Sequence, residues 1–247
     1  MLTAGFTKPF LTAEWRYLAM LNYQIDPAIL QPYVPKKTEL DDWNGKIFVS
    51  MVGFLFLNTR VIGLPIPFHQ NFEEINLRFY VRRKAEDGWR RGVVFVKEIV
   101  PRLAIALTAR WLYGENYVAL PTGSVICRAG GGATNIESVK YYWTFHRRAQ
   151  FIELITRGEP ADFIEGSQEE FIAQHYWGYS SQRTGGTVAY HVEHPPWRIW
   201  QMGSARLDCD VENLYGERFV GCLRGPPSSA FLAEGSAITV YRGAKIL

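Results

Sequence analysis

Residues 72–84 alternate apolar and polar side chains, and this two-residue period limits the possible folds, because it is the period of a β-strand. One face of the predicted strand is apolar: Ile75, Leu77, Phe79 and Val81. The opposite face carries Glu74, Asn76 and Arg78. The apolar face predicts a core. The polar face fits either solvent or the inside of a barrel, where a carboxylate beside a guanidinium would mark a ligand pocket.

The rest of the chain also favours strands. Aromatic residues make up 15% of the sequence and 22 glycines are spread along it, which is typical of strands separated by turns rather than of a helical bundle. Further strands are predicted at about 45–60, 92–99, 117–127, 139–147, 151–156, 188–193, 198–209 and 238–242. The predicted fold class is mainly β with a few short helices (α+β).

Helix start and stop signals occur in four places. They predict helices at 26–35, at 101–114, from residue 167 onward and at 211–215. The third of these begins with a capping box, in which Ser167 precedes Glu170 by three residues. No linker, low-complexity tract or repeat divides the chain, so residues 1–247 are predicted to form one domain.

Charge and hydropathy exclude several classes of function. The formal net charge is only +3 and the basic residues are not segregated, which argues against a nucleic-acid binder. The N-terminus lacks the pattern of a secretory signal. The richest apolar run, Ile47–Leu57, is shorter than the roughly 20 residues of a spanning helix, so no membrane association and a cytoplasmic location are expected.

Motifs for metal, phosphate and acyl-transfer chemistry are not found. The three cysteines lack CxxC spacing, and His191 and His194, three residues apart on a strand, would point to opposite faces. His194 is predicted to begin a rigid His-Pro-Pro-Trp corner with Trp197 packed beneath it. No serine lies in a GxSxG elbow and no glycine-rich segment matches a nucleotide-binding loop. Neither metal nor cofactor is therefore expected.

One further cluster, residues 175–179, combines a histidine with tyrosines and a tryptophan. It holds more hydrogen-bond donors than a core needs, but a position between core and rim accounts for it.

Several blocks of sequence, in this order, resemble the uncharacterised DUF2071 (YqjF-like) family. They are 14–18 (EWRYL), 25–27 (IDP), 34–35 (VP), 71–81 (NFEEINLRFYV), 91–95 (RGVVF), 109–114 (ARWLYG), 166–171 (GSQEEF) and 194–197 (HPPW). The resemblance spans about residues 13 to 243 and extends in pattern to the acetoacetate decarboxylase-like β-barrels. It implies a closed or nearly closed mixed barrel with a central polar cavity and a helix at its side.

The same resemblance implies where a reaction centre would lie. In the decarboxylase, a lysine forms a Schiff base with a β-keto acid, with arginine and glutamate side chains nearby. Arg16 resembles the arginine position and Glu74 the glutamate position. The lysine pair should follow the glycine that ends the second helix, but here Tyr117 and Val118 stand at those positions. Without an amine there is no iminium electron sink, so Schiff-base decarboxylation is not expected.

Two hypotheses of function remain. In the first, the barrel binds a small organic anion or carbonyl compound through charged and hydroxyl groups: Arg16, Glu74, Asn76, Arg78, Arg110 and Tyr117. Glu74 and Tyr117 are then the candidate acid–base residues of a lyase or isomerase that uses no Schiff base. In the second, side chains fill the barrel and an aromatic surface with Tyr176, Tyr179 and Trp197 in the contact serves assembly, for which a homodimer would be suited. An open cavity lined by Glu74, Arg78 and Tyr117 would favour the first.

Overall fold

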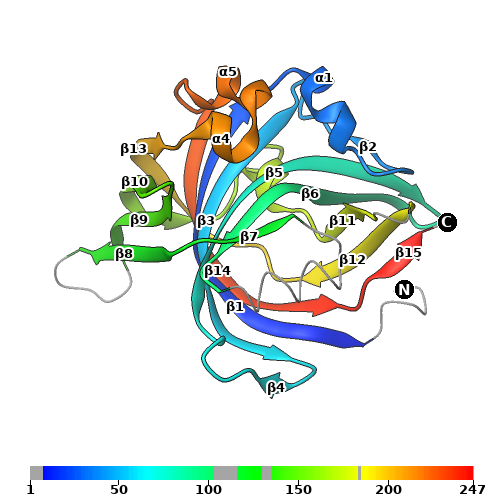
Figure 1. Cartoon of the computed structure of the whole chain (residues 1–247), viewed down its shortest axis with the longest axis horizontal. Helices are drawn as coiled ribbons and strands as arrows, with labels where there is room; N and C mark the ends of the chain where they lie inside the picture. The colour runs from blue at the N-terminus through cyan, green and yellow to red at the C-terminus, as the bar shows by residue number, and fades with distance from the viewer. Residues whose placement is uncertain (1–7, 103–115, 130–134, 183–184, 247) are drawn as a thin grey trace.

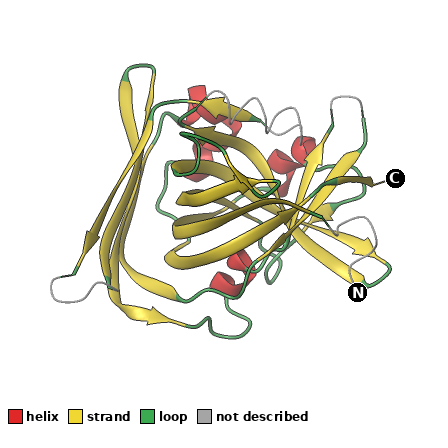
Figure 2. Cartoon of the chain, turned by 90° about the horizontal axis from the view of Figure 1, so that it is seen from below, coloured by secondary structure: helices red, strands yellow, loops and turns green. Residues whose placement is uncertain are grey.

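The structure is a computed structural model that describes residues 8–102, 116–129, 135–182 and 185–246. Strands account for 62% of the described residues and helices for 11%, which confirms the predicted class. Figure 2 shows short helices arranged around a large assembly of strands. The predicted helix at 101–114 falls almost entirely outside the described residues.

The strands are β1 (Pro9–Gln24), β2 (Glu39–Leu40), β3 (Phe48–Val61), β4 (Leu64–Pro65), β5 (Phe72–Ala85), β6 (Gly88–Val100), β7 (Tyr117–Ala119), β8 (Thr122–Arg128), β9 (Ile136–Phe145), β10 (Arg148–Ala161), β11 (Trp177–Ser181), β12 (Thr187–Glu193), β13 (Ile199–Asp208), β14 (Ser229–Tyr241) and β15 (Ala244–Ile246). The helices are α1 (Pro27–Leu30), α3 (Gln168–Ala173), α4 (Val211–Tyr215) and α5 (Val220–Leu223), with 3-10 turns η1 (Gln31–Tyr33) and η2 (Glu217–Phe219).

Strand pairing closes part of the sheet into a barrel. The described strands follow the order β12, β11, β6, β5, β3, β1 and β14, and β14 pairs back onto β12. Most neighbours are antiparallel, whereas β6 and β11 run parallel. The fold is therefore the mixed barrel that the sequence resemblance implies.

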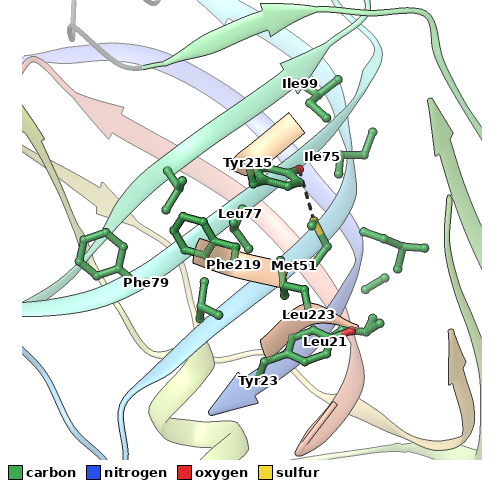
Figure 3. Close-up of a cluster of buried hydrophobic side chains, with 14 of the residues drawn as sticks. Leu21, Tyr23, Met51, Ile75, Leu77, Phe79, Ile99, Tyr215, Phe219 and Leu223 are labelled. Atoms are coloured by element: carbon green, nitrogen blue, oxygen red, sulfur yellow. Dashed lines mark hydrogen bonds between the residues drawn. The ribbon is translucent and has the colours of Figure 1, made fainter. Parts of the chain in front are cut away.

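The same sheet continues beyond the barrel and covers one side of it. β14 also pairs with β13, which leads through β10 and β9 to β8 (Figure 1). The outward faces of β1, β3 and β5 are consequently buried, in a core shared with these strands, α4 and α5. Figure 3 shows part of this core, in which Leu77, Met51 and Phe219 meet and the Tyr215 hydroxyl donates to Met51 Sδ at 3.6 Å.

β5 therefore has a buried layer on each face. Its apolar residues Ile75, Leu77, Phe79 and Val81 are fully buried, as their alternation predicts. Its polar residues point to the other side, where a second cluster of apolar side chains from β1, β3, β12, β14 and α3 fills much of the barrel interior. The solvent-facing alternative for this polar face is thus wrong.

The predicted helix caps are confirmed. Asp26 accepts from the backbone N–H of Ala28, and Ser167 accepts from that of Glu170. In contrast, β1 is not predicted, since the first strand expected from the sequence begins at about residue 45. Its second half is buried on both faces and its register against β3 shifts between Arg16 and Ala19, so it lacks a regular alternation.

Candidate functional site

The barrel interior contains a cavity of about 310 Å³. Three alternate residues of β5 contribute to its wall, Glu74, Asn76 and Arg78, and all three are at most 8% exposed. The rest of the described lining is mainly aromatic and aliphatic. It includes Trp15 and Leu18 of β1, Phe54 and Phe56 of β3, Phe95 of β6, and Trp197. The cavity thus combines a few polar groups with a large apolar wall, as ligand sites commonly do.

Glu74 and Asn76 form a hydrogen-bonded pair in this wall. The Asn76 side-chain N–H₂ donates to Glu74 Oε1 at 3.0 Å. Glu98 of β6 lies opposite Asn76 in the strand register and also lines the cavity, and Tyr117 of β7 lies opposite Glu98. Two carboxyl groups, an amide and a phenol are therefore held side by side by adjacent strands. Glu98 is not among the predicted residues, although a lone carboxylate in the apolar run 93–100 is a detectable signal.

Arg78 is the only arginine or lysine among the described residues that line the cavity. Its guanidinium contacts Met20 Sδ at 3.7 Å and lies 5.9 Å from the centre of the Tyr80 ring. Within the described part of the chain no carboxylate forms an ion pair with it, and its Nε has no hydrogen-bond partner. The cavity wall thus holds a buried cation that forms no ion pair with a described carboxylate, while the carboxyl groups of Glu74 and Glu98 lie elsewhere in the same wall.

His175, directly after α3, connects the cavity to a buried ion-pair network. It lines the cavity, and its Nε2 lies 3.7 Å from Oδ2 of Asp41, which accepts from Arg91 Nε at 2.6 Å. Burial lowers the pKa of His175 to about 4, so the ring is neutral at pH 7. Burial acts to raise the pKa of Asp41, but His175 and Arg91 outweigh it and lower that pKa, so Asp41 is ionised.

A second histidine, His194, also lines the cavity and stacks on Trp197 with ring centres 4.2 Å apart. This geometry confirms the predicted rigid corner. Burial lowers the pKa of His194 as well. Neither His175 nor His194 is among the predicted ligand-binding residues, because neither position carries a local signal that it will face a cavity.

The other predicted site residues do not join this group. Arg16 donates from Nε and Nη2 to Glu14 Oε2, at 2.9 and 2.7 Å, and it is not part of the cavity lining. Its neighbour Trp15 lines the cavity instead, because successive strand residues face opposite sides. Arg110 lies outside the described residues.

Every lysine of the chain is among the described residues, and none lines the cavity. Lys97 comes nearest in sequence, on β6 beside Glu98, but it points to the opposite side and donates to the carbonyl of Leu214. Burial lowers its pKa.

Neither a metal-binding cluster nor a membrane-spanning helix is found among the described residues. No group of three or more His, Cys, Asp or Glu side chains is placed to hold a metal ion. Among the helices of these residues, none has the length and hydrophobicity needed to cross a membrane.

The barrel and its cavity define the class of the protein as the acetoacetate decarboxylase-like fold. The structure resembles acetoacetate decarboxylase from Legionella pneumophila with a TM-score of 0.66 at 12% identity, over 98% of this chain and 89% of the other. It resembles the enduracididine biosynthesis enzyme MppR, with HEPES bound, at a TM-score of 0.69 and 14% identity, over 99% and 90%. MppR complexed with pyruvate gives 0.66 and 12%, over 99% and 93%. At these identities the likeness shows the fold alone.

The chain belongs to the DUF2071 family, described as an uncharacterized conserved protein, whose sequence profile matches residues 12–237. It is also 39% identical over 75 residues to the uncharacterized protein YqjF of Bacillus subtilis (strain 168). That match covers 30% of this chain and 31% of the length of YqjF.

Proposed function

We propose that the protein binds a small organic anion or carbonyl compound inside the barrel, without forming a Schiff base. The observation that carries this proposal is Arg78, a buried guanidinium in the cavity wall with no carboxylate partner among the described residues. A bound anion would supply the missing charge and accept hydrogen bonds from it. Glu74, Asn76 and Tyr117 are the polar groups proposed to contact the rest of the ligand.

The cavity lining supports the absence of Schiff-base chemistry. That reaction needs a lysine amine at the substrate carbonyl, and no lysine of this chain lines the cavity. The related fold of MppR, whose structure is described as complexed with pyruvate, agrees with a barrel that holds a small acid.

The competing hypothesis of a filled barrel with an aromatic assembly surface has less support. The barrel interior contains a cavity, and two of the aromatic residues proposed for such a surface, Tyr179 and Trp197, are 1% and 5% exposed.

The test is a thermal-shift screen of the purified protein against keto acids, hydroxy acids and aromatic carboxylates, followed by calorimetric titration of any hit. A ligand at 100 times its Kd should stabilise the protein by about 2.7 kcal/mol, or roughly 5 to 10 °C in Tm. Arg78→Met should abolish the shift, whereas Arg157→Met, at an exposed arginine of β10, should leave it unchanged. Lack of a shift across the panel, or an unchanged affinity in Arg78→Met, would refute the proposal.

A further inference from the structure

The cavity is elongated along the strands. Its lining on β5 runs from Phe72 to Arg78, which corresponds to about 20 Å at roughly 3.4 Å per residue. On β1, which is separated from β5 by β3, it runs from Leu11 to Leu18. The strand register places Leu11 and Arg78 at opposite ends of the cavity. Leu11 pairs with Val61 at one end of β3, whereas Arg78 pairs with Ser50 near the other end of β3. A short keto acid bound at Arg78 would leave most of this length unfilled.

The two ends differ in exposure. At the Arg78 end the lining residues Ala173 and His175 are buried. At the other end the lining residues Phe10, Val61 and His69 are partly exposed, and Ile66 is 39% exposed. The cavity therefore reaches the surface beside the β3–β4 hairpin, and the cation Arg78 lies at its other end, where Phe95, which pairs with Arg78, is also partly exposed.

The hairpin at this mouth is unusually apolar. Its exposed side chains form one group, which we call the lip: Ile62, Leu64, Ile66 and Phe68. Phe68 is 83% exposed and Ile62 is 72% exposed. Figure 1 shows the hairpin projecting at the bottom of the molecule, away from α4 and α5. Several exposed apolar side chains on one hairpin mark a binding surface more often than scattered single residues do.

Part of the cavity between the lip and Arg78, at the level of Phe72 and Glu74, has an aromatic wall. The Trp15 ring lies 5.5 Å from Phe54 and 5.8 Å from Phe56, and Phe56 stacks on Phe72 at 4.7 Å. Such a wall favours an apolar body over a hydrated one, because water bound there would find few hydrogen-bond partners.

We propose that the ligand is a monocarboxylic acid with an extended apolar tail, bound with its carboxylate at Arg78 and its tail along the aromatic wall to the lip. This inference rests on the proposed function and narrows its ligand class. One lining cation among the described residues matches one carboxylate, and the length of the cavity matches a chain rather than a compact acid. The lip covers the part of the tail that leaves the barrel.

The test is a calorimetric titration of the whole protein with straight-chain monocarboxylates from acetate to hexadecanoate, kept below micelle-forming concentrations. Each buried methylene should tighten binding about three- to four-fold, with one acid bound per chain. Decanol, which has the tail without the carboxylate, and sebacate, which carries a second carboxylate at the tail end, should each bind at least ten-fold more weakly than decanoate.

Variants separate the two ends of the site. Arg78→Met should weaken hexanoate and hexadecanoate by a similar factor, whereas Phe68→Ser should weaken hexadecanoate several-fold and leave hexanoate unchanged. Ile164→Ser is the matched control, because Ile164 is 78% exposed, as Phe68 is 83% exposed, but lies outside the lip. It should change neither acid.

The outcomes distinguish the two proposals. If keto acids bind through Arg78 but affinity does not rise with chain length, the tailed ligand is refuted and the proposed function stands. If no acid binds at all, the proposed function fails as well. If hexadecanoate binds equally well to Phe68→Ser and to the unaltered chain, the lip has no part in binding and that part of the inference is wrong.

Discussion

Arg78 carries a positive charge into a wall made mostly of aromatic and aliphatic side chains. A buried charge without a partner is costly, and replacing it with an apolar residue of similar volume is often neutral or stabilising. Arg78→Met should therefore raise the free energy of unfolding of the ligand-free protein by about 1 kcal/mol. Urea denaturation measures this, with the exposed Arg157→Met as a control that should stay within about 0.5 kcal/mol. A loss of more than about 1 kcal/mol in Arg78→Met would mark Arg78 as a structural residue instead.

For single residues, the sequence predicts which side chains share one face of a strand but not which other elements cover that face. Alternation correctly groups Glu74, Asn76 and Arg78, because side-chain direction along a strand is a local property. Their burial depends on distant strands that close the barrel. The contributions of Glu98 and His175 to the cavity have the same origin, and for Arg16 the resemblance identifies a position whose side chain here pairs with Glu14.

Elements with local signals are predicted well. Asp26 and Ser167 cap helices that begin where expected, and α4 has the predicted bounds. β1 has no such signal, because residues 19–23 are buried on both faces and the strand is irregular at Tyr17, whose φ is 54°. The parallel pairing of β6 with β11 also has no local sequence signal, since it joins segments far apart in the chain.

Gly92 makes that parallel pairing close enough to form. A Cβ at this position would clash with the backbone carbonyl of Trp177 and meet the Tyr179 ring at 2.7 Å. Because backbone cannot move aside as a flexible side chain does, Gly92→Ala should lower the free energy of unfolding by about 2 kcal/mol. Gly221→Ala in α5 is the control, since no atom lies within 4 Å of its added Cβ, and it should cause no loss. Equal stability of the two variants in urea would contradict the close approach.

At the scale of the whole molecule, barrel closure decides what the site is. β12 meets β14 at Val192 and Glu193, which brings His194 and Trp197 to the cavity that β5 lines from the other side. The fold resembles that of acetoacetate decarboxylase, yet every lysine lies outside the cavity lining. The same barrel thus presents a different set of groups to its interior, which is why fold alone does not establish a reaction here.

Closure also buries titratable groups, and this makes global stability depend on pH. The pKa of His175 is about 4 in the folded protein, against 6.5 for an ordinary histidine. Between these values the unfolded chain holds a proton that the folded protein lacks, so stability falls as the pH drops from about 6.5 to about 4. Burial lowers the pKa of His191 and His194 too, and both act in the same direction. Asp41, whose pKa is also lowered, loses its contribution only at still lower pH.

His175→Gln should remove the share of this pH dependence that belongs to His175. Urea denaturation at pH 7.0 and 4.5 measures it: the unaltered protein should lose about 2 kcal/mol more between these conditions than the variant does, because each unit of pKa shift is worth about 1.4 kcal/mol. His146→Gln, at an exposed histidine, controls for the substitution itself. If His175→Gln and the unaltered protein lose the same stability on acidification, His175 does not titrate as a buried neutral ring. Its contact with Asp41 would then have to be an ion pair that persists at neutral pH.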